Sequence, residues 1–270
     1  MQVPMKRDDH DYLELLLAPM RECRSYRPAF GQADDAGISL VQFRKLYGAD
    51  QLYHWVGLDS DLMYAAHKAA GGMTSIYRQL GVGCERLLCA IVRDTLSLSD
   101  DEASWRYEYE KEDGKIGIHT LDCRIDTRHL AHKRQRDAMK DWLSKSAISL
   151  GLDPKRASGL QGTVLEIRQG YKSADSKRQN ADLRFGMRAF NEGYLPVIAV
   201  VSSQVSEVVC RRYRASQMLV LVGTSGTAQE STFSFFRDAV GHDLAGFFAR
   251  NSAEIRREFS HIVGALLSAD

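Results

Sequence analysis

The chain has 270 residues, of which 44% are hydrophobic and 26% are charged, and its formal net charge is +1. This composition is typical of a globular protein and argues against a disordered chain. The sequence contains no run of about 18 uncharged apolar residues. Residues 1–11 lack the apolar core of a signal peptide, so we expect a cytoplasmic protein that has no membrane partner.

The five cysteines are scattered, and no two of them have CxxC spacing. This argues against a disulfide framework and a zinc site, and we expect reduced thiols. Motifs for other chemistry are also absent: the sequence has no GxxxxGK[ST], GxGxxG, HExxH or GxSxG. It therefore offers no support for a nucleotide cofactor, a zinc protease or a serine hydrolase.

Residues 1–72 are expected to form a helical N-terminal layer. Amphipathic patterns predict helices at 12–26, 39–47 and 60–67, and the pair Gly71-Gly72 predicts a break after the last of them. We find no chemistry in this region. We expect it to pack on the core formed by residues 73–270, within one compact domain, or on a partner subunit.

Residues 73–96 have apolar side chains at helical spacing, which predicts a helix, and Glu85 lies within it. Glu85 is either a metal-binding acid or a solvated, capping one. Residues 104–127 predict a hairpin whose second strand, 116–125, carries Asp122 on the face opposite Leu121 and Cys123. A carboxylate within a strand is a candidate site residue unless that face of the strand is solvated.

Residues 127–150 predict a helix with the basic sequence HKRQR at 132–136, which would lie along phosphates or form a solvated face. Residues 162–203 then predict strand, loop, cationic helix and strand. Period two places Glu166, Arg168 and Lys172 on one face of the first strand. The helix, 177–191, is expected to turn Leu183, Met187 and Phe190 towards the sheet.

The apolar run 195–201 should be a parallel neighbour of the strand that contains Glu166, because the connection has the length of a strand–helix–strand crossover. A further strand is predicted at 218–222, and helices at 233–248 and 253–267.

Two carboxylates on adjacent strands with a lysine nearby form a hard-oxygen site that suits Mg²⁺. The window 172–188 carries five Lys or Arg against two Asp. Phosphodiesters fit both the metal and these cations, so the pattern favours hydrolysis of a phosphodiester by a metal-activated water.

The order helix, strand, strand with Asp122, strand with Glu166, helix, strand resembles the PD-(D/E)xK nuclease core. The segment GYKSADSKRQNADL followed by GYLPV is similar to type II restriction endonucleases, in particular the ApaLI-like group. The resemblance covers roughly residues 73–214. It implies an α/β fold with a central mixed sheet flanked by helices, here with the helical N-terminal layer added.

The resemblance also implies roles for individual residues. Asp122 would be the metal-binding acid of the second strand, with Asp126 as the alternative, and Glu166 would be the acid of the (D/E)xK element. Glu85 would be a third metal ligand. Arg168 stands where the family has its catalytic lysine, so Lys172 or Lys177 would supply that lysine instead.

If the resemblance holds, the protein is a homodimer that cuts double-stranded DNA at a short palindrome with Mg²⁺. Its DNA contacts would come from the polar and basic residues around the cationic helix and after the following strand, since Arg reads guanine and Gln reads adenine. These candidates are Arg178, Gln179, Asn180, Ser203, Gln204, Arg211, Arg212 and Arg214. The alternative for the arginines is a set of surface ion pairs.

Two other functions fit the same residues. One is a less specific nuclease, such as a DNA-repair enzyme. The other is a non-catalytic nucleic-acid-binding protein on a nuclease-like fold, which Arg168 in place of lysine would favour.

Overall fold

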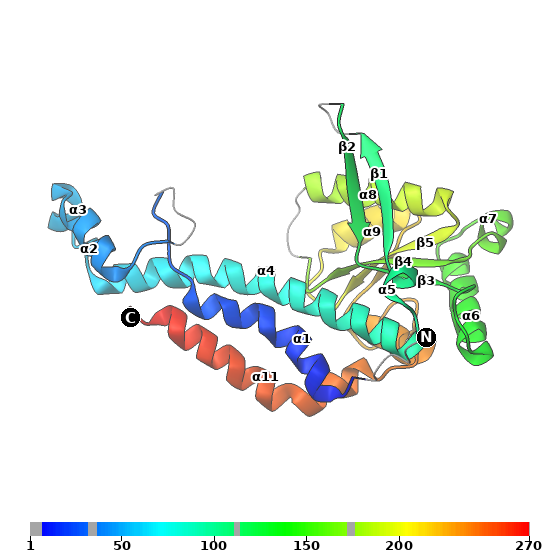
Figure 1. The fold of residues 1–270 in the computed structure, drawn as a ribbon. Coiled ribbons are helices and arrows are strands. Elements are labelled where there is room, and N and C mark those ends of the chain that lie inside the picture. The colour runs from blue at the N-terminus through cyan, green and yellow to red at the C-terminus, as the bar shows by residue number, and fades with distance from the viewer. Residues whose placement is uncertain (1–6, 32–36, 111–113, 172–175, 270) are drawn as a thin grey trace. The chain divides into compact units, whose positions relative to one another are not determined.

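A computed structural model describes residues 7–31, 37–110, 114–171 and 176–269 (Figure 1). The fold is mixed α/β, with helices that flank two β-sheets. The chain divides into two compact units: Met1–Tyr12 with Cys84–Ala249, and Leu13–Gly83 with Arg250–Asp270. Both units are made of segments that are distant in sequence.

Helices form the unit Leu13–Gly83 with Arg250–Asp270. It contains α2 (Leu40–Gly48), α3 (Gln51–Trp55), most of α1 (Asp9–Arg21), and parts of α4 (Asp61–Leu96) and α11 (Leu244–Leu267). The predicted helix 39–47 is confirmed, and Ser39 forms a capping box with Gln42 at its start.

The predicted break at Gly71-Gly72 is wrong, because α4 continues through both glycines for 36 residues. A Cβ atom at Gly71 would overlap the side chain of Tyr26, and one at Gly72 would overlap Leu266. Glycine is therefore used here for close packing against other segments and not to end the helix.

The other unit contains the sheets. Its strands are β1 (Trp105–Glu110), β2 (Ile116–Leu121), β3 (Cys123–Asp126), β4 (Gly162–Arg168), β5 (Tyr194–Val200) and β6 (Leu219–Leu221). Its helices include α5 (Asp100–Ala103), α6 (Lys133–Ser149), α7 (Pro154–Ser158), α8 (Ser176–Asn191), α9 (Glu207–Ala215) and α10 (Thr232–Phe235), and a π-helix follows at Phe236–Val240.

The central sheet has the strand order β3-β4-β5-β6. Strand β3 is antiparallel to β4, whereas β4, β5 and β6 are parallel to one another. The expected crossover is confirmed, because β4, α8 and β5 follow one another and the two strands pair in parallel. The sheet is therefore mixed.

Strands β1 and β2 pair antiparallel as a separate hairpin that extends beyond the central sheet (Figure 1). The single strand expected at 116–125 is wrong, because the chain bends at Asp122 and starts a new strand at Cys123. The pairing of β3 with β4 ends at Cys123 and Leu165. Further along this edge of β4, the backbone N–H of Ile167 donates to Asp122 Oδ2 at 2.6 Å in place of a strand partner. The carboxylate thus replaces a partner that the ladder no longer provides.

One face of the central sheet packs against α8 and α9. Val164, Ile198 and Val200 share a buried cluster with Phe185 and Ala189 of α8. The expectation that Met187 would face the sheet is wrong, since 64% of this residue is exposed. The helix is rotated so that Asp182, Phe185 and Ala189 are buried, which brings a carboxylate into the core.

In the part of the chain that the structure describes, no helix is both long enough and apolar enough to cross a membrane.

Candidate functional site

Four charged residues predicted from the sequence come together at the end of β4. Glu166 and Arg168 lie on β4, and Asp122 directly precedes Cys123, which pairs with Leu165, so Asp122 lies level with Glu166. The charges of Glu166 and Glu85 both act on Asp122, and Arg168 acts on Asp122 and on Glu85. We call these four residues the acid cluster. They come from three separate segments.

Asp122 is a strongly perturbed acid of the cluster. Burial and the negative charges of Glu166 and Glu85 raise its pKa to about 8, although the hydrogen bond from Ile167 and the charge of Arg168 act in the opposite direction. Its backbone carbonyl accepts a hydrogen bond from Cys89 Sγ of α4 at 3.0 Å. With all three acids ionised, the site would carry an excess of negative charge that a bound cation would relieve.

Glu166 is buried, and its Oε1 lies 2.5 Å from Arg168 Nη1. This ion pair agrees with the prediction that both residues share one face of the strand. The guanidinium also reaches Asp182 of α8, with 3.1 Å between Nη2 and Oδ1. Arg168 is therefore held between two buried carboxylates, which fixes its position.

Asp182 belongs to a buried polar network that the sequence analysis missed. The hydroxyl of Tyr213 donates to Asp182 Oδ2 at 2.7 Å, and that of Tyr171 donates at 3.3 Å. The two hydroxyls are themselves 2.8 Å apart. Burial, and then the hydrogen bonds with Tyr171 and Asp182, raise the pKa of Tyr213, so this hydroxyl stays protonated. No motif identifies the network, because an acid in an amphipathic helix usually indicates a solvated face.

Glu85 is exposed on α4, one helical turn before Cys89. Partial desolvation raises its pKa, and the positive charges of Arg86 and Arg168 lower it. Glu85 is thus near the other two acids but more open to solvent. The exposure of Glu85 favours a charge at the periphery of the site over a buried metal ligand.

Asp126, the alternative first acid, has another role. It lies at the far end of β3, where Arg128 donates to both of its carboxylate oxygens and Tyr194 donates to Oδ2 at 2.8 Å. Burial alone would raise its pKa, but these hydrogen bonds outweigh burial and lower the pKa to about 2. Asp126 is therefore a satisfied structural carboxylate, separate from the acid cluster.

The two candidate lysines are Lys172 and Lys177. Lys172 lies outside the described residues. Lys177 and Arg178 belong to the first turn of α8, but their side chains are outside the described part.

The candidate DNA contacts fall into two groups. Arg212 of α9 donates from Nη1 to Gln179 and from Nη2 to Asn180 of α8, each at 2.7 Å, so these three residues lie together. Ser203 and Gln204 are exposed in the loop after β5. Arg211 and Arg214 are also exposed. Arg211 forms a loose ion pair of 3.8 Å with Glu207, which is the alternative role, a surface ion pair, that the sequence left open for these arginines.

The described residues contain no group of three or more His, Cys, Asp or Glu side chains that could hold a metal ion. Mg²⁺ does not require one, because proteins usually bind it through one or two carboxylates, water and substrate phosphates. Asp122 and Glu166 are such a pair of oxygen donors, and the negative charges of Glu166 and Glu85 both act on the buried Asp122. The donor set therefore fits Mg²⁺.

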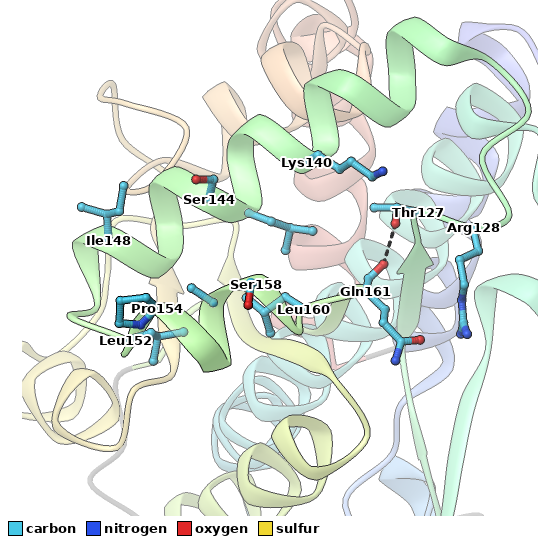
Figure 2. A pocket seen from close by; sticks show the side chains of 12 residues that line it. Thr127, Arg128, Lys140, Ser144, Ile148, Leu152, Pro154, Ser158, Leu160 and Gln161 are labelled. Atoms are coloured by element: carbon cyan, nitrogen blue, oxygen red, sulfur yellow. Dashed lines mark hydrogen bonds between the residues drawn. The ribbon is translucent and has the colours of Figure 1, made fainter.

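An open hollow of about 700 Å³ lies elsewhere in this unit, between α6, α7 and the start of β4 (Figure 2). Its rim carries Arg128 and Lys140, and apolar side chains such as Leu143 and Ile148 line it. Figure 2 shows Thr127 donating to the backbone oxygen of Gln161 at its edge. No acid of the cluster lines this hollow, so it is not part of the candidate site.

None of the protein-family models, curated proteins and solved structures with which the chain was compared matches it. A function therefore has to be inferred from the chain's own residues and their geometry.

Proposed function

We propose that this protein is a Mg²⁺-dependent, sequence-specific endonuclease for double-stranded DNA, of the type II restriction class and active as a homodimer. The observation that carries the proposal is the acid cluster: two carboxylates at one level of adjacent strands, a third nearby and a fixed arginine. These residues are up to 83 positions apart in the chain, from 85 to 168, yet they share one site. Such a site combines oxygen donors for Mg²⁺ with a cation for phosphate.

Each residue of the cluster has a distinct task in this proposal. Asp122 and Glu166 would hold Mg²⁺, and when bound the ion would activate a water and polarise the phosphodiester. The Ile167 N–H, which donates to Asp122 Oδ2, orients that carboxylate. Asp182 and Glu166 hold the guanidinium of Arg168, so the cation does not need to be ordered when the substrate arrives.

Arg168 cannot take the proton of the attacking water, because an arginine stays protonated at any ordinary pH. It acts as a fixed positive charge for the phosphate. In this proposal a proton acceptor has to come from elsewhere, and Lys172 and Lys177 remain the candidates.

The direct test is incubation of the protein with phage DNA and Mg²⁺. Discrete bands support a site-specific enzyme, a smear supports the less specific nuclease, and intact DNA with every divalent metal tried would refute both. Glu166→Ala should abolish cleavage and leave DNA binding measurable. Asp141→Ala, which removes an exposed carboxylate paired with Lys145 on α6, is the matched control and should cleave like the wild type.

One observation favours a non-catalytic nucleic-acid-binding protein. The ion pair between Arg168 and Glu166, at 2.5 Å, already neutralises the acid that would bind the metal. Titration calorimetry with Mg²⁺ and Ca²⁺ separates the two functions. Binding that is lost in Glu166→Ala supports the enzyme, and absence of binding in the wild-type protein supports the inert fold.

A further inference from the structure

Strand β1 and helix α8 lie side by side near the acid cluster. Trp105 Nε1, at the start of β1, donates to Glu192 just after α8 at 2.9 Å. Two residues along, the guanidinium of Arg188 lies 5.7 Å from the ring centroid of Tyr107, and its Nη2 donates to the backbone oxygen of Glu108 at 3.3 Å. Residue numbers rise along β1 from Trp105 to Tyr107 while those of their partners fall from Glu192 to Arg188. Strand β1 and helix α8 therefore run in opposite directions.

The solvent face of α8 carries two arginines along this contact, and one of them, Arg188, forms a loose i,i+4 ion pair of 3.7 Å with Glu192. Arg184 and Arg188 are one helical turn apart, and both are exposed, as is Met187 between them. The acid within α8, Asp182, is buried on the opposite side and is already bonded to Arg168 and Tyr213. Arg184 forms no ion pair with a carboxylate in the described part of the chain, so its charge faces solvent.

The same face leads to the acid cluster. Burial raises the pKa of the Tyr107 hydroxyl. The charges of Arg184 and Arg188 lower this pKa, and the charge of Glu166 raises it. Tyr107 therefore contacts the basic face of α8 through Arg188 and lies within electrostatic range of Glu166 on β4.

We propose that Arg184 and Arg188, supported by Tyr107 of β1, bind consecutive phosphates of one nucleic-acid strand and lead that strand to the acid cluster. The inference rests on the proposed nuclease function and assigns a specific role to two of the five cations in the window 172–188. Arginine suits this role because its planar donors match phosphate oxygens, and the Tyr107 ring supports the guanidinium of Arg188. Both arginines would contact phosphates of the nucleic-acid backbone, so the affinity of this contact does not depend on base sequence.

The test measures binding of a short synthetic DNA duplex in EDTA, without cleavage, over a range of salt concentrations. Each phosphate contact that is removed should lower the slope of log K against log salt by about 0.9. The double variant Arg184→Gln, Arg188→Gln should therefore lose about two units of slope, with weaker binding to every duplex. The double lysine variant keeps both charges and should retain the slope.

Arg257→Gln on α11 is the matched control, because it removes an arginine whose side chain is 60% exposed from another helix. Its slope should equal that of the wild type. A circular dichroism melt of each variant checks that it is folded at the temperature of the binding measurement.

The outcomes separate this inference from the proposed function. If the wild-type protein cleaves DNA but the glutamine double variant keeps the full slope, the phosphate contacts are overturned and the nuclease proposal stands. If the wild-type protein shows no salt-dependent binding to any duplex, both are overturned. A reduced slope in the glutamine variant that lysine restores supports the inference.

Discussion

The position of Arg168 depends on a hydroxyl group that does not touch it. Tyr213 donates to Asp182 Oδ2, and Asp182 Oδ1 accepts from Arg168, so the hydroxyl fixes the carboxylate that fixes the guanidinium. All of these groups are largely buried, where a missing hydrogen bond is costly because water cannot replace it.

Tyr213→Phe removes only that hydroxyl. We expect the free energy of unfolding to fall by about 1–2 kcal/mol. If the protein is a nuclease, kcat should fall roughly tenfold, because Arg168 is less well positioned, while KM stays near the wild-type value. Tyr171→Phe is the comparison, because the Tyr171 hydroxyl contacts Asp182 at the longer distance of 3.3 Å, and this variant should lower kcat less. A loss of stability with unchanged kcat would show that the network is only structural.

Asp126 provides a pH-dependent prediction that does not involve the acid cluster. Its pKa is lowered from 3.8 to about 2 in the folded state. Its ionised form therefore stabilises the fold above pH 4, and this contribution is lost as the pH falls from 4 towards 2. Asp126→Asn should lower the free energy of unfolding at pH 7 by roughly 2 kcal/mol, and the difference from wild type should shrink towards pH 2.

Urea unfolding of both proteins at several pH values measures this difference. Asp137→Asn is a suitable comparison, because Asp137 is an exposed acid that pairs with Lys133 on α6. It should change stability little at any pH. A pH-independent difference for Asp126→Asn would contradict the assignment of a lowered pKa.

At the scale of elements, the sequence determined the strand–helix–strand unit well and the other parts of the site less well. Apolar runs predicted β4 and β5 and their parallel pairing, and period two correctly placed Glu166 beside Arg168. The bend at Asp122 was missed, because the apolar residues Leu121, Cys123 and Ile125 alternate with polar ones on both sides of it. The rotation of α8 was also missed, since the burial of Asp182 depends on partners from β4 and α9.

The glycines of α4 also show why part of the fold could not be predicted from sequence. A glycine pair in the sequence predicts the end of a helix, but the role of a glycine depends on the residues that pack against it in space. A Cβ atom at Gly83 would overlap the backbone oxygen of Leu16. We expect Gly83→Ala to destabilise the protein by about 1–3 kcal/mol, despite the higher helix propensity of alanine.

Gly264→Ala on α11 is the matched control, because its Cβ atom would meet no other atom within 4 Å. This variant should stabilise the protein by roughly 0.5–1 kcal/mol. Thermal unfolding of the two variants measures the contrast, and a gain in stability for Gly83→Ala would rule out the close approach of α1 and α4.

At the scale of the whole molecule, the described residues of one chain form one acid cluster, whereas a palindrome presents two equivalent phosphodiesters, one on each strand. The proposed homodimer supplies the second cluster and the two-fold symmetry. Analytical ultracentrifugation should therefore give about twice the chain mass of 30.3 kDa.

Mixing subunits tests the number of active clusters. Wild-type and Glu166→Ala chains that carry different affinity tags are unfolded together, refolded and purified through both tags. The mixed dimer should nick a supercoiled plasmid, because only one of its clusters is active, and it should linearise the plasmid far more slowly than the wild type. Linear product at the wild-type rate would mean that a single cluster cuts both strands.

The bend between β2 and β3 makes Asp122 a hinge as well as a proposed metal ligand. The hairpin leaves the central sheet at this residue, and the Asp122 side chain clamps the bend to β4 through Ile167. Any swing of the hairpin would pivot at Asp122 and turn its carboxylate, so movement of the hairpin and the geometry of the acids are mechanically linked. Substitution of Asp122 by alanine would release the hinge and remove the acid together. Glu166 is therefore the cleaner residue with which to separate chemistry from motion.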